Sequence, residues 1–425
     1  MLNNDVKNFL NMIKAVLFIF LVFFTVNFAL AHNNEEQKFI SSDNVIKLFF
    51  LSPLETRKPI NACETEACQA LLREINNSKE TIDFAIYGIG GQDAIFNAIV
   101  QAKKRGVKIR GVTDADKNGV NIYKDTEKLM QILGTMKTDS ILSNDKESES
   151  ELGFQTAIMH DKFFVIDKKF VWTGSANISS TDITGFNSNV VLLIKSPQII
   201  SLYLQEFEQM FQGKFHTFKK AVQNNENIII PDNSVVSVYF SPEHQAISTK
   251  IIPLIYNAKR YIYIPAFYLT HKQLSQSLID AHKRGVDIKI IIDATSASGK
   301  YAVHKTLREE GISVKVENFA GKMHMKSIII DDNTLVIGSM NFTNQGERRN
   351  DENCLIIKNN SDMTIKYREH FLQLWKAISD KWLYANPPAE SSDSPGSCSD
   401  GVDNDFDGFV DSNDFGCTSR SKVTK

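Results

Sequence analysis

The sequence has few cysteines and no large excess of charge of either sign. Its 425 residues include five cysteines, too few for a disulfide scaffold and not spaced as a zinc-binding set. Lys and Arg total 48 and Asp and Glu total 50, so the chain lacks the basic excess that grips nucleic acid by charge alone. Apolar residues make up 42% and charged residues 23%, which excludes a disordered chain and leaves room for more than one domain.

Long apolar runs are also scarce, since only residues 15–31 form one. Lysines precede this run and it ends in Ala-Leu-Ala, the pattern of a secretory signal peptide cleaved before His32. An uncleaved membrane anchor is the alternative, because a run of about 17 residues is the lower limit for crossing a bilayer. We expect a signal peptide at residues 1–31 and a secreted or periplasmic protein, in which disulfides can form.

An internal repeat organises the rest of the chain. Residues 75–115 and 255–295 each contain a short apolar run, a helical period, the sequence A-x-K-R-G-V and a second apolar run ending in Asp-Ala. The continuous apolar runs indicate two parallel strands joined by a helix. We expect Gly106 and Gly285 to end the two helices, with Lys and Arg in the last turn. The repeat therefore predicts an α/β protein built from two pseudo-symmetric halves.

The repeat continues into a polar motif, which His160 and His324 begin. Both stretches read H-x-K-x4-D-x6-G-S-x-N. Residues two apart in a strand share a face, so each histidine shares a face with its lysine. A charged Lys ligates metals poorly but binds phosphate oxygens well, and Ser and Asn can donate further hydrogen bonds to the same oxygens. The candidate site residues of the two motifs are His160, Lys162, Ser175 and Asn177, and His324, Lys326, Ser339 and Asn341.

Two histidines suit the cleavage of a phosphodiester. One must be neutral to attack phosphorus, and the other must be protonated to deliver a proton to the leaving alkoxide. Two lysines then neutralise the charge on the oxygens of the transition state. Identical spacing in both halves argues against a purely structural role for the histidines.

This doubled pattern resembles the hallmark of the phospholipase D superfamily, and the resemblance covers about residues 44–386. It implies two α/β halves with mixed sheets flanked by helices, one shared active site, no catalytic cofactor and a covalent phosphohistidine intermediate. By similarity to two-motif members, His160 is the nucleophile, and His324 is the acid and then the base of the second step.

Three acidic residues accompany the motifs. Asp167 and Asp331 lie on the opposite strand face from the histidines by parity, which favours a structural role. Glu352 matches the acidic residue that orients a histidine in the superfamily, but the first half has Asn189 at the corresponding position. An amide can orient a ring nitrogen without supplying charge, so we expect one histidine to have a less raised pKa.

Composition and spacing set the expected boundaries: a first half at 44–211, a connector at 212–234, a second half at 235–386 and an acidic tail at 387–425. The first half also carries about 15 extra residues before its motif, expected within 135–156 as a surface loop beside the site.

The motif predicts the reaction class better than the substrate. We expect the substrate to be a phospholipid at a membrane surface, cleaved at its headgroup phosphodiester bond. We also expect the enzyme to be a monomer. A metal-independent nuclease is the alternative, and the near-neutral charge argues weakly against it. A cardiolipin synthase normally needs membrane spans, and a binding-only protein would not need both motifs intact.

The tail contains regularly spaced aspartates around Gly408. Their spacing fits positions 1, 3, 5, 9 and 12 of a calcium loop, with a backbone carbonyl at position 7 and a glycine at the sharp turn. The expected ligands of a structural calcium ion are Asp403, Asp405, Asp407, the Phe409 carbonyl, Asp411 and Asp414. The alternative is a solvated acidic tail, because no helical pattern flanks the loop.

The cysteines form two close pairs and one remainder. Cys398 and Cys417 bracket the acidic loop and are expected to clamp it, and Cys63 and Cys68 form the second pair. Cys354 lies in an apolar run, so we expect a buried free thiol.

Overall fold

The computed structural model describes residues 39–40, 45–56, 58–115, 119–142 and 157–418. The expected signal peptide at 1–31 therefore lies outside the described residues, as do residues 143–156 of the expected loop. A search of the described helices finds none with the length and apolarity needed to cross a bilayer.

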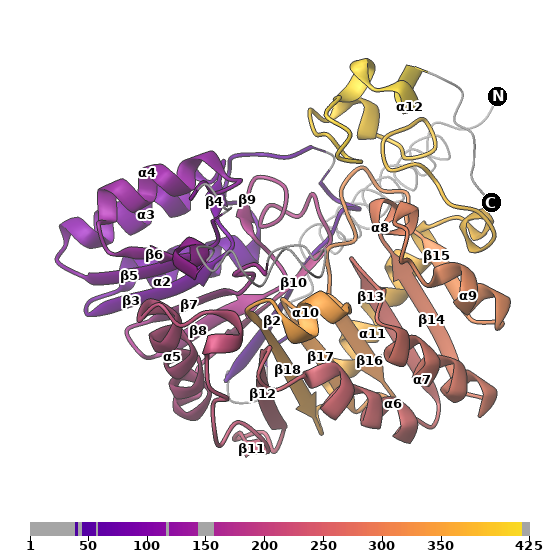
Figure 1. Ribbon diagram of the computed structural model, residues 1–425, viewed down its shortest axis with the longest axis horizontal. Coiled ribbons are helices and arrows are strands. Elements are labelled where there is room, and N and C mark those ends of the chain that lie inside the picture. Colours follow the sequence, from indigo (N-terminus) through magenta and orange to yellow (C-terminus); the bar gives the residue numbers. More distant parts are fainter. Residues whose placement is uncertain (1–38, 41–44, 57, 116–118, 143–156, 419–425) are drawn as a thin grey trace, which may run out of the picture. The chain divides into compact units, whose positions relative to one another are not determined.

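Two eight-stranded sheets dominate the described chain, one in each half (Figure 1). The first sheet runs in the order β1 (Phe39–Ile40), β2 (Ile46–Leu51), β10 (Asn189–Ile194), β8 (Phe170–Gly174), β7 (Lys162–Ile166), β3 (Thr81–Ile86), β5 (Lys108–Thr113) and β6 (Met136–Thr138). The second runs in the order β11 (Ile228–Ile229), β12 (Val235–Ser241), β18 (Glu352–Lys358), β17 (Thr334–Gly338), β16 (Ser327–Ile330), β13 (Tyr261–Ala266), β14 (Asp287–Ile292) and β15 (Ser313–Val316). Corresponding strands occupy the same place in both sheets.

The sheets are mixed because a β-α-β unit supplies the parallel part of each. β3 pairs parallel with β5, and β13 with β14, across helices α3 (Asp93–Lys104) and α7 (Lys272–Lys283). Both helices end before a glycine at positive φ, Gly106 at 88° and Gly285 at 91°, which other residues rarely adopt. The motif strands pair antiparallel, β7 with β8 and β16 with β17. The predicted α/β fold of two halves is confirmed.

Helices cover the sheets, and the two halves share a core. Helix α2 (Glu66–Asn77) packs with α3 on one face of the first sheet, and α6 (Ile252–Asn257) packs with α7 on one face of the second. Helices α5 (Pro197–Phe211) and α11 (Ser361–Ala377) join side chains from both sheets in a central cluster. Each large apolar side chain buried there contributes about 1.5–3 kcal/mol, so the halves stabilise each other.

The described chain also contains shorter elements. Among them are α4 (Lys124–Leu133), α8 (Ala294–Ser298), α9 (His304–Glu309), α10 (Asn344–Arg348), α12 (Phe415–Thr418) and the strand pair β4 (Ile89–Gly90) and β9 (Ile178–Ser179). The front of the expected loop at 135–156 is not a loop, because β6 pairs parallel with β5 and a 3-10 turn follows at Asp139–Leu142. The connector also contributes structure, since β11 belongs to the second sheet.

Both expected disulfides are present. Cys63 bonds Cys68 and Cys398 bonds Cys417, and Cys354 is a buried free thiol. The pairing that we predicted from the sequence is confirmed.

Candidate active site

The two histidines occupy corresponding places at the start of a hairpin. In the first half, His160 comes just before β7 and Lys162 opens it, and antiparallel pairing with β8 brings the following Ser175 back toward His160. The second half repeats this arrangement around His324 with β16 and β17.

Backbone hydrogen bonds cross between the halves at both histidines. The His160 N–H donates to the Asp351 carbonyl at 2.9 Å, and the His324 N–H donates to the Ser188 carbonyl at 2.9 Å. Each accepting residue comes immediately before the partner of the corresponding histidine side chain. The crossing therefore brings both motifs together where the halves meet.

A carboxylate from the second half holds the first histidine. His160 Nδ1 lies 2.9 and 2.8 Å from the two carboxylate oxygens of Glu352, which is fully buried. The Ser339 hydroxyl donates to the same carboxylate at 2.7 Å, and the Asn350 amide donates at 3.3 Å. With Nδ1 held in this way, Nε2 is the ring nitrogen that can reach a substrate.

An amide from the first half holds the second histidine. His324 Nδ1 lies 3.0 Å from Asn189 Oδ1, to which the Ser175 hydroxyl also donates at 2.8 Å. Asn189 Nδ2 donates to Asp182 Oδ1 at 3.2 Å, and Asp182 Oδ2 lies 3.6 Å from His324 Nδ1. The sequence alignment predicted the place of Asn189 but missed Asp182, which follows the first motif without a counterpart in the repeat.

The serines and one asparagine support other side chains rather than facing a ligand. We expected these groups to donate to phosphate oxygens. Instead, both serine hydroxyls donate to the histidine partners, and the Asn177 amide donates to Asp182 Oδ2 at 2.6 Å. Among the described residues, the Oδ1 atoms of Asn177 and Asn341 have no hydrogen-bond partner. These oxygens are available to a bound hydrogen-bond donor.

The two lysines are buried, and each contacts the backbone of its own motif. Lys162 and Lys326 are each 1% exposed, and each ammonium group donates to the carbonyl of its own histidine, at 2.8 and 2.6 Å. Burial lowers the pKa of Lys162 to about 8 and lowers the pKa of Lys326 well below its ordinary value. In the free site, burial therefore outweighs the nearby carboxylates of Glu352 and Asp182, which act to raise both pKa values.

Burial also lowers the pKa of the two histidines. Burial and then the two lysines lower the pKa of both His160 and His324 well below the ordinary value. Burial also raises the pKa of Glu352 to about 8. We expected a raised histidine pKa, and neither ring has one without a ligand. A bound phosphate anion would reverse part of this shift.

The motif aspartates lie at the hairpin turns, away from the histidines. The Asp167 carboxylate accepts backbone N–H groups of Glu80 at 2.8 Å and Thr81 at 3.0 Å. Asp331 accepts the equivalent groups of Arg260 at 2.7 Å and Tyr261 at 3.0 Å. Both carboxylates tie a turn to the start of a neighbouring strand.

Buried acids hold the backbone just before each histidine. The Met159 N–H donates to Asp114 at 3.0 Å and to Asp139 at 2.9 Å, and burial beside Asp139 raises the pKa of Asp114 to about 8. In the second half the Met323 N–H donates to Asp293 at 3.1 Å. Asp114 and Asp293 are the aspartates of the repeated Asp-Ala, so the repeat contained this signal although we gave it no role.

The connector adds a buried ion-pair network behind His160. Lys219 is fully buried at its side chain and pairs with Glu206 and, at 2.8 Å, with Asp351. His216 Nδ1 lies 3.0 Å from the same Asp351 carboxylate. Since the Asp351 carbonyl accepts the His160 N–H, the connector fixes the backbone of the first motif. The sequence predicted only a connector in this segment.

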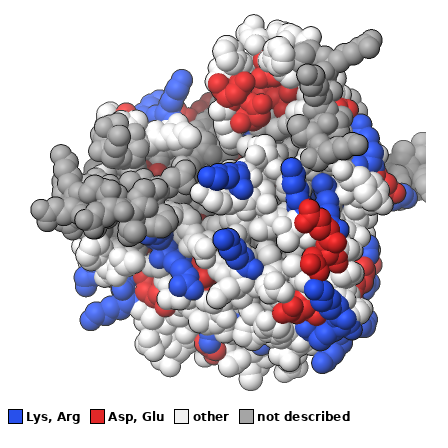
Figure 2. All heavy atoms as spheres, turned by 45° about the vertical axis from the view of Figure 1, so that its right-hand side comes forward, with Lys and Arg blue, Asp and Glu red and all other residues white. Residues whose placement is uncertain are grey.

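The tail gathers carboxylates, although not the full set that we expected. Figure 2 shows acidic side chains in one patch at the top of the view. Two groups of carboxylate oxygens lie within 4.8 Å of one another: Glu390, Asp403 and Asp405, and Asp405, Asp407 and Asp414. Asp411 instead accepts the backbone N–H of Asp400 at 3.0 Å.

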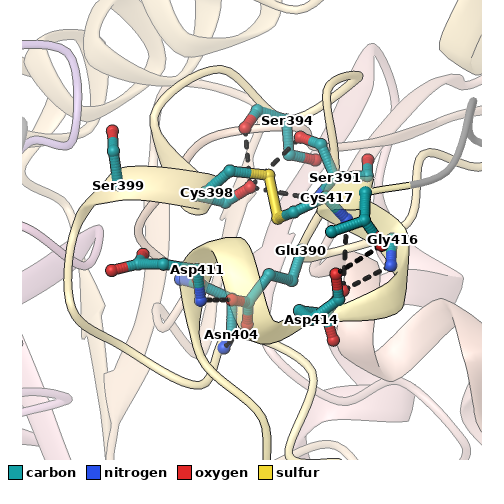
Figure 3. The surroundings of a disulfide bond; sticks show 12 residues. Glu390, Ser391, Ser394, Cys398, Ser399, Asn404, Asp411, Asp414, Gly416 and Cys417 are labelled. Atoms are coloured by element: carbon teal, nitrogen blue, oxygen red, sulfur yellow. Dashed lines mark hydrogen bonds between the residues drawn. A yellow bond between two sulfur atoms is a disulfide. The ribbon is translucent and has the colours of Figure 1, made fainter.

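Glu390 is the tail residue that the sequence analysis missed. Its carboxylate is fully buried inside the loop and accepts the backbone N–H groups of Asn404, at 2.7 Å, and Asp411 (Figure 3). The Lys322 ammonium donates to the Asn404 carbonyl and lies 4.1 Å from the Phe406 ring centroid. The tail thus touches the chain two residues before His324.

Comparison with known proteins gives a family match and relatives that cover much of the chain. A family model described as cardiolipin synthase, PLD-like domain matches residues 71–211 and 251–375. A phospholipase D of Rickettsia prowazekii (strain Madrid E) is 31% identical over 170 residues, 40% of this chain and 80% of that protein. Cardiolipin synthase A of Proteus mirabilis (strain HI4320) is 23% identical over 355 residues, 76% of this chain and 70% of that protein.

A solved structure shares the fold. The crystal structure of phosphatidylserine synthase from Haemophilus influenzae Rd KW20 superposes with a TM-score of 0.58, at 13% identity, over 79% of this chain and 87% of that one. The family model covers more than half of this chain and includes one stretch from each half. The chain therefore belongs to the phospholipase D superfamily, in the family of cardiolipin synthase PLD-like domains.

Proposed function

We propose that this protein is a phosphodiesterase of the phospholipase D type that hydrolyses the headgroup ester of a phospholipid. The observation that carries the proposal is the crossing of the two motifs. Each histidine has its Nδ1 held by a residue of the other half, and two buried ammonium groups lie beside them. This arrangement offers two Nε2 atoms and two cations to a single phosphate group.

In the first step, His160 Nε2 attacks phosphorus and the bond from phosphorus to the leaving oxygen breaks. The proton on His324 Nε2 passes to that oxygen, so the alcohol leaves neutral. The covalent phosphohistidine carries positive charge on its ring, and Glu352 at 2.8 Å from Nδ1 stabilises it.

In the second step, His324 is neutral and accepts a proton from water. The water oxygen attacks phosphorus, the bond from phosphorus to His160 Nε2 breaks, and the site returns to its starting state. Lys162 and Lys326 balance the negative charge on the non-bridging oxygens in both steps. No step requires a metal.

A phospholipid is the substrate that the relatives favour. The phospholipase D of Rickettsia prowazekii and cardiolipin synthase A of Proteus mirabilis are both named for reactions on phospholipids. The net charge of −2 adds no support for a polyanionic substrate. A nuclease of the same superfamily is the alternative activity.

One assay tests the reaction and the substrate together. Phosphatidylcholine vesicles and plasmid DNA are incubated side by side with the protein in EDTA at low temperature, with His160→Ala as the control. We expect release of the lipid headgroup by the wild type and none by the variant. Cleavage of DNA alone would favour the nuclease, and an enzyme inactive in EDTA and rescued by magnesium alone would overturn the mechanism.

We also propose that the tail binds a structural calcium ion and that the protein is secreted or periplasmic. The five carboxylates of Glu390, Asp403, Asp405, Asp407 and Asp414 support the first proposal, since calcium prefers several oxygen ligands. The two disulfides support the second, because disulfides persist in oxidising compartments. We further propose that the protein is a monomer and that it binds a lipid surface. Sedimentation without vesicles measures the oligomeric state, and sedimentation with vesicles measures lipid binding.

A further inference from the structure

The two halves supply negative charge to their histidines in different ways. Glu352 contacts His160 directly, whereas the equivalent residue Asn189 contacts His324 with a neutral amide. The sheet registers confirm the equivalence, because Val191 pairs with Gly174 and Cys354 with Gly338. A reaction that needs a protonated His324 therefore needs its negative charge from another residue.

Asp182 is the carboxylate placed to supply it. Its Oδ2 lies 3.6 Å from His324 Nδ1, and its Oδ1 accepts the Asn189 Nδ2 amide at 3.2 Å. This second bond fixes which way the Asn189 amide points, so that its oxygen faces His324. The chain of contacts runs from the histidine through the amide to the acid.

Asp182 is also a buried carboxylate that, among the described residues, has no lysine or arginine within 4 Å. It is 1% exposed, and its other hydrogen-bond donors are neutral groups of Asn177 and Asn187. Within the described residues, His324 is the one basic side chain that lies within 4 Å of it. A buried carboxylate is costly unless it is paired, so a protonated His324 is the partner that lowers this cost.

We propose that Asp182 is a positioning residue that gives His324, through and alongside Asn189, the carboxyl partner that Glu352 gives His160. The inference rests on the proposed function, in which His324 is the general acid. Asp182 thereby favours the protonated ring before the first step and fixes its Nδ1 so that Nε2 faces the leaving oxygen.

The groups around His324 make this charge necessary. The basic side chains that act on it come from its own segment, as Lys322 and Lys326, and from the first half, as Lys162 and His160. The Phe267 ring packs on it with centroids 5.0 Å apart and supplies no charge. All of these basic side chains disfavour the protonated ring.

Moving the charge tests the proposal. Three variants are compared with the wild type: Asp182→Asn, Asn189→Asp, and both together, each checked by thermal unfolding. The readout is the basic limb of the pH profile of kcat/KM, which reports the general acid of the free enzyme. We expect Asp182→Asn to move this limb to lower pH by about one unit, and Asn189→Asp to move it to higher pH.

The double variant restores a carboxylate next to His324 and should return the limb toward its wild-type position. A substrate with a nitrophenol leaving group needs little acid, so its first-step burst should fall less in Asp182→Asn than release of an alkyl alcohol. If Asp182→Asn does not fold, the double variant is compared with Asn189→Asp instead. A basic limb at lower pH in the double variant supports the role of Asp182, and identical limbs overturn it.

An unmoved limb in all folded variants would overturn the inference and leave Asp182 as a support for the Asn177 loop. Failure of the proposed function would differ, because the wild type itself would then cleave no phosphodiester. Wild-type activity that His160→Ala abolishes, with an unmoved limb, would refute only the role of Asp182.

Discussion

At the scale of residues, the site contains four basic groups whose charged forms are all disfavoured before a ligand binds. Lys162 has a pKa lowered to about 8 by burial, and the pKa values of Lys326, His160 and His324 are lowered as well. An anion that enters this cluster favours the charged forms of all four. Ligand binding should therefore be coupled to proton uptake.

The proton uptake can be measured with inorganic phosphate or vanadate. Calorimetric titrations at pH 7.5 in two buffers with different ionisation enthalpies should show net uptake of protons on binding. The reason is that binding raises pKa values that lie near or below the working pH. The variant Lys326→Met should bind more weakly and take up fewer protons. Proton release, or equal heats in both buffers, would contradict this description of the site.

The identity of the nucleophile is a second question at this scale. If His160 attacks phosphorus, rapid acid-free quenching with labelled substrate should trap label on His160. The variant His324→Ala should accumulate this adduct when the leaving group is good, because its second step lacks a base. Peptide mapping by mass spectrometry locates the label. Label on His324 would reverse the two roles.

At the scale of elements, the connector determines how rigidly the first motif is held. Lys219 lies between η2 (His216–Phe218) and the second sheet, with its ammonium group on Asp351 and Glu206. Lys219→Met leaves both carboxylates buried without their cation, which costs about 3–5 kcal/mol when one partner of a buried pair is removed. Thermal unfolding should show a clear loss, and activity should fall with it.

Lys220→Met is the matched control for that variant. Lys220 is the next residue of the connector and is exposed to solvent. Its replacement should change the free energy of unfolding by less than about 0.5 kcal/mol. Equal effects of the two substitutions would show that the buried network does not stabilise the first motif.

The tail is the second element with a specific expectation. Without a cation, the carboxylates around Asp405 repel one another, and burial raises the pKa of Asp405 and of Glu390. EDTA should therefore loosen the tail while the disulfide from Cys398 to Cys417 still closes it. Limited proteolysis followed by mass spectrometry should find cuts within 400–416 in EDTA that calcium suppresses and magnesium does not. Equal cutting in all three conditions would leave a solvated acidic tail.

The elements show what the sequence could and could not predict. The repeat, both motifs and the disulfides follow local patterns, so spacing alone placed His160 and His324. Asp182, Lys219 and Glu390 act through contacts between distant segments and have no counterpart in the repeat. Periodicity carries no information on such contacts, and only the folded arrangement of the sheets brings these side chains to their partners.

At the scale of the whole molecule, many buried groups keep a proton that the unfolded chain would lose. The pKa values that burial raises lie at about 8 for Asp114 and Glu352 and about 7 for Asp161 and Glu243. His216 is partly desolvated, but Asp351 and Asp139 raise its pKa to about 9. Between pH 6.5 and 8 the folded state thus binds more protons than the unfolded state.

Stability should consequently fall as pH rises through this window. The free energy of unfolding decreases with pH wherever the folded state holds the extra protons. Buried neutral histidines such as His370 act in the opposite sense below about pH 7. The lowered pKa values of Lys162 and Lys326 also act in the opposite sense within the window, but the groups with raised pKa values outnumber them. Thermal unfolding at pH 6.5, 7.2 and 8.0 checks this, and Glu352→Gln should flatten the slope. A midpoint that rises with pH would contradict the protonation states described for the buried acids.

Because each half supplies a residue to the other half's histidine, the two halves depend on each other when the chain is split. Neither half contains a complete acid–base centre, because the residue that holds Nδ1 of each histidine comes from the opposite sheet. A single half would recover a working centre only by pairing with a second copy in the same crossed geometry. In this chain the pairing is intramolecular, so corresponding positions of the two halves can hold different residues, as Glu352 and Asn189 do.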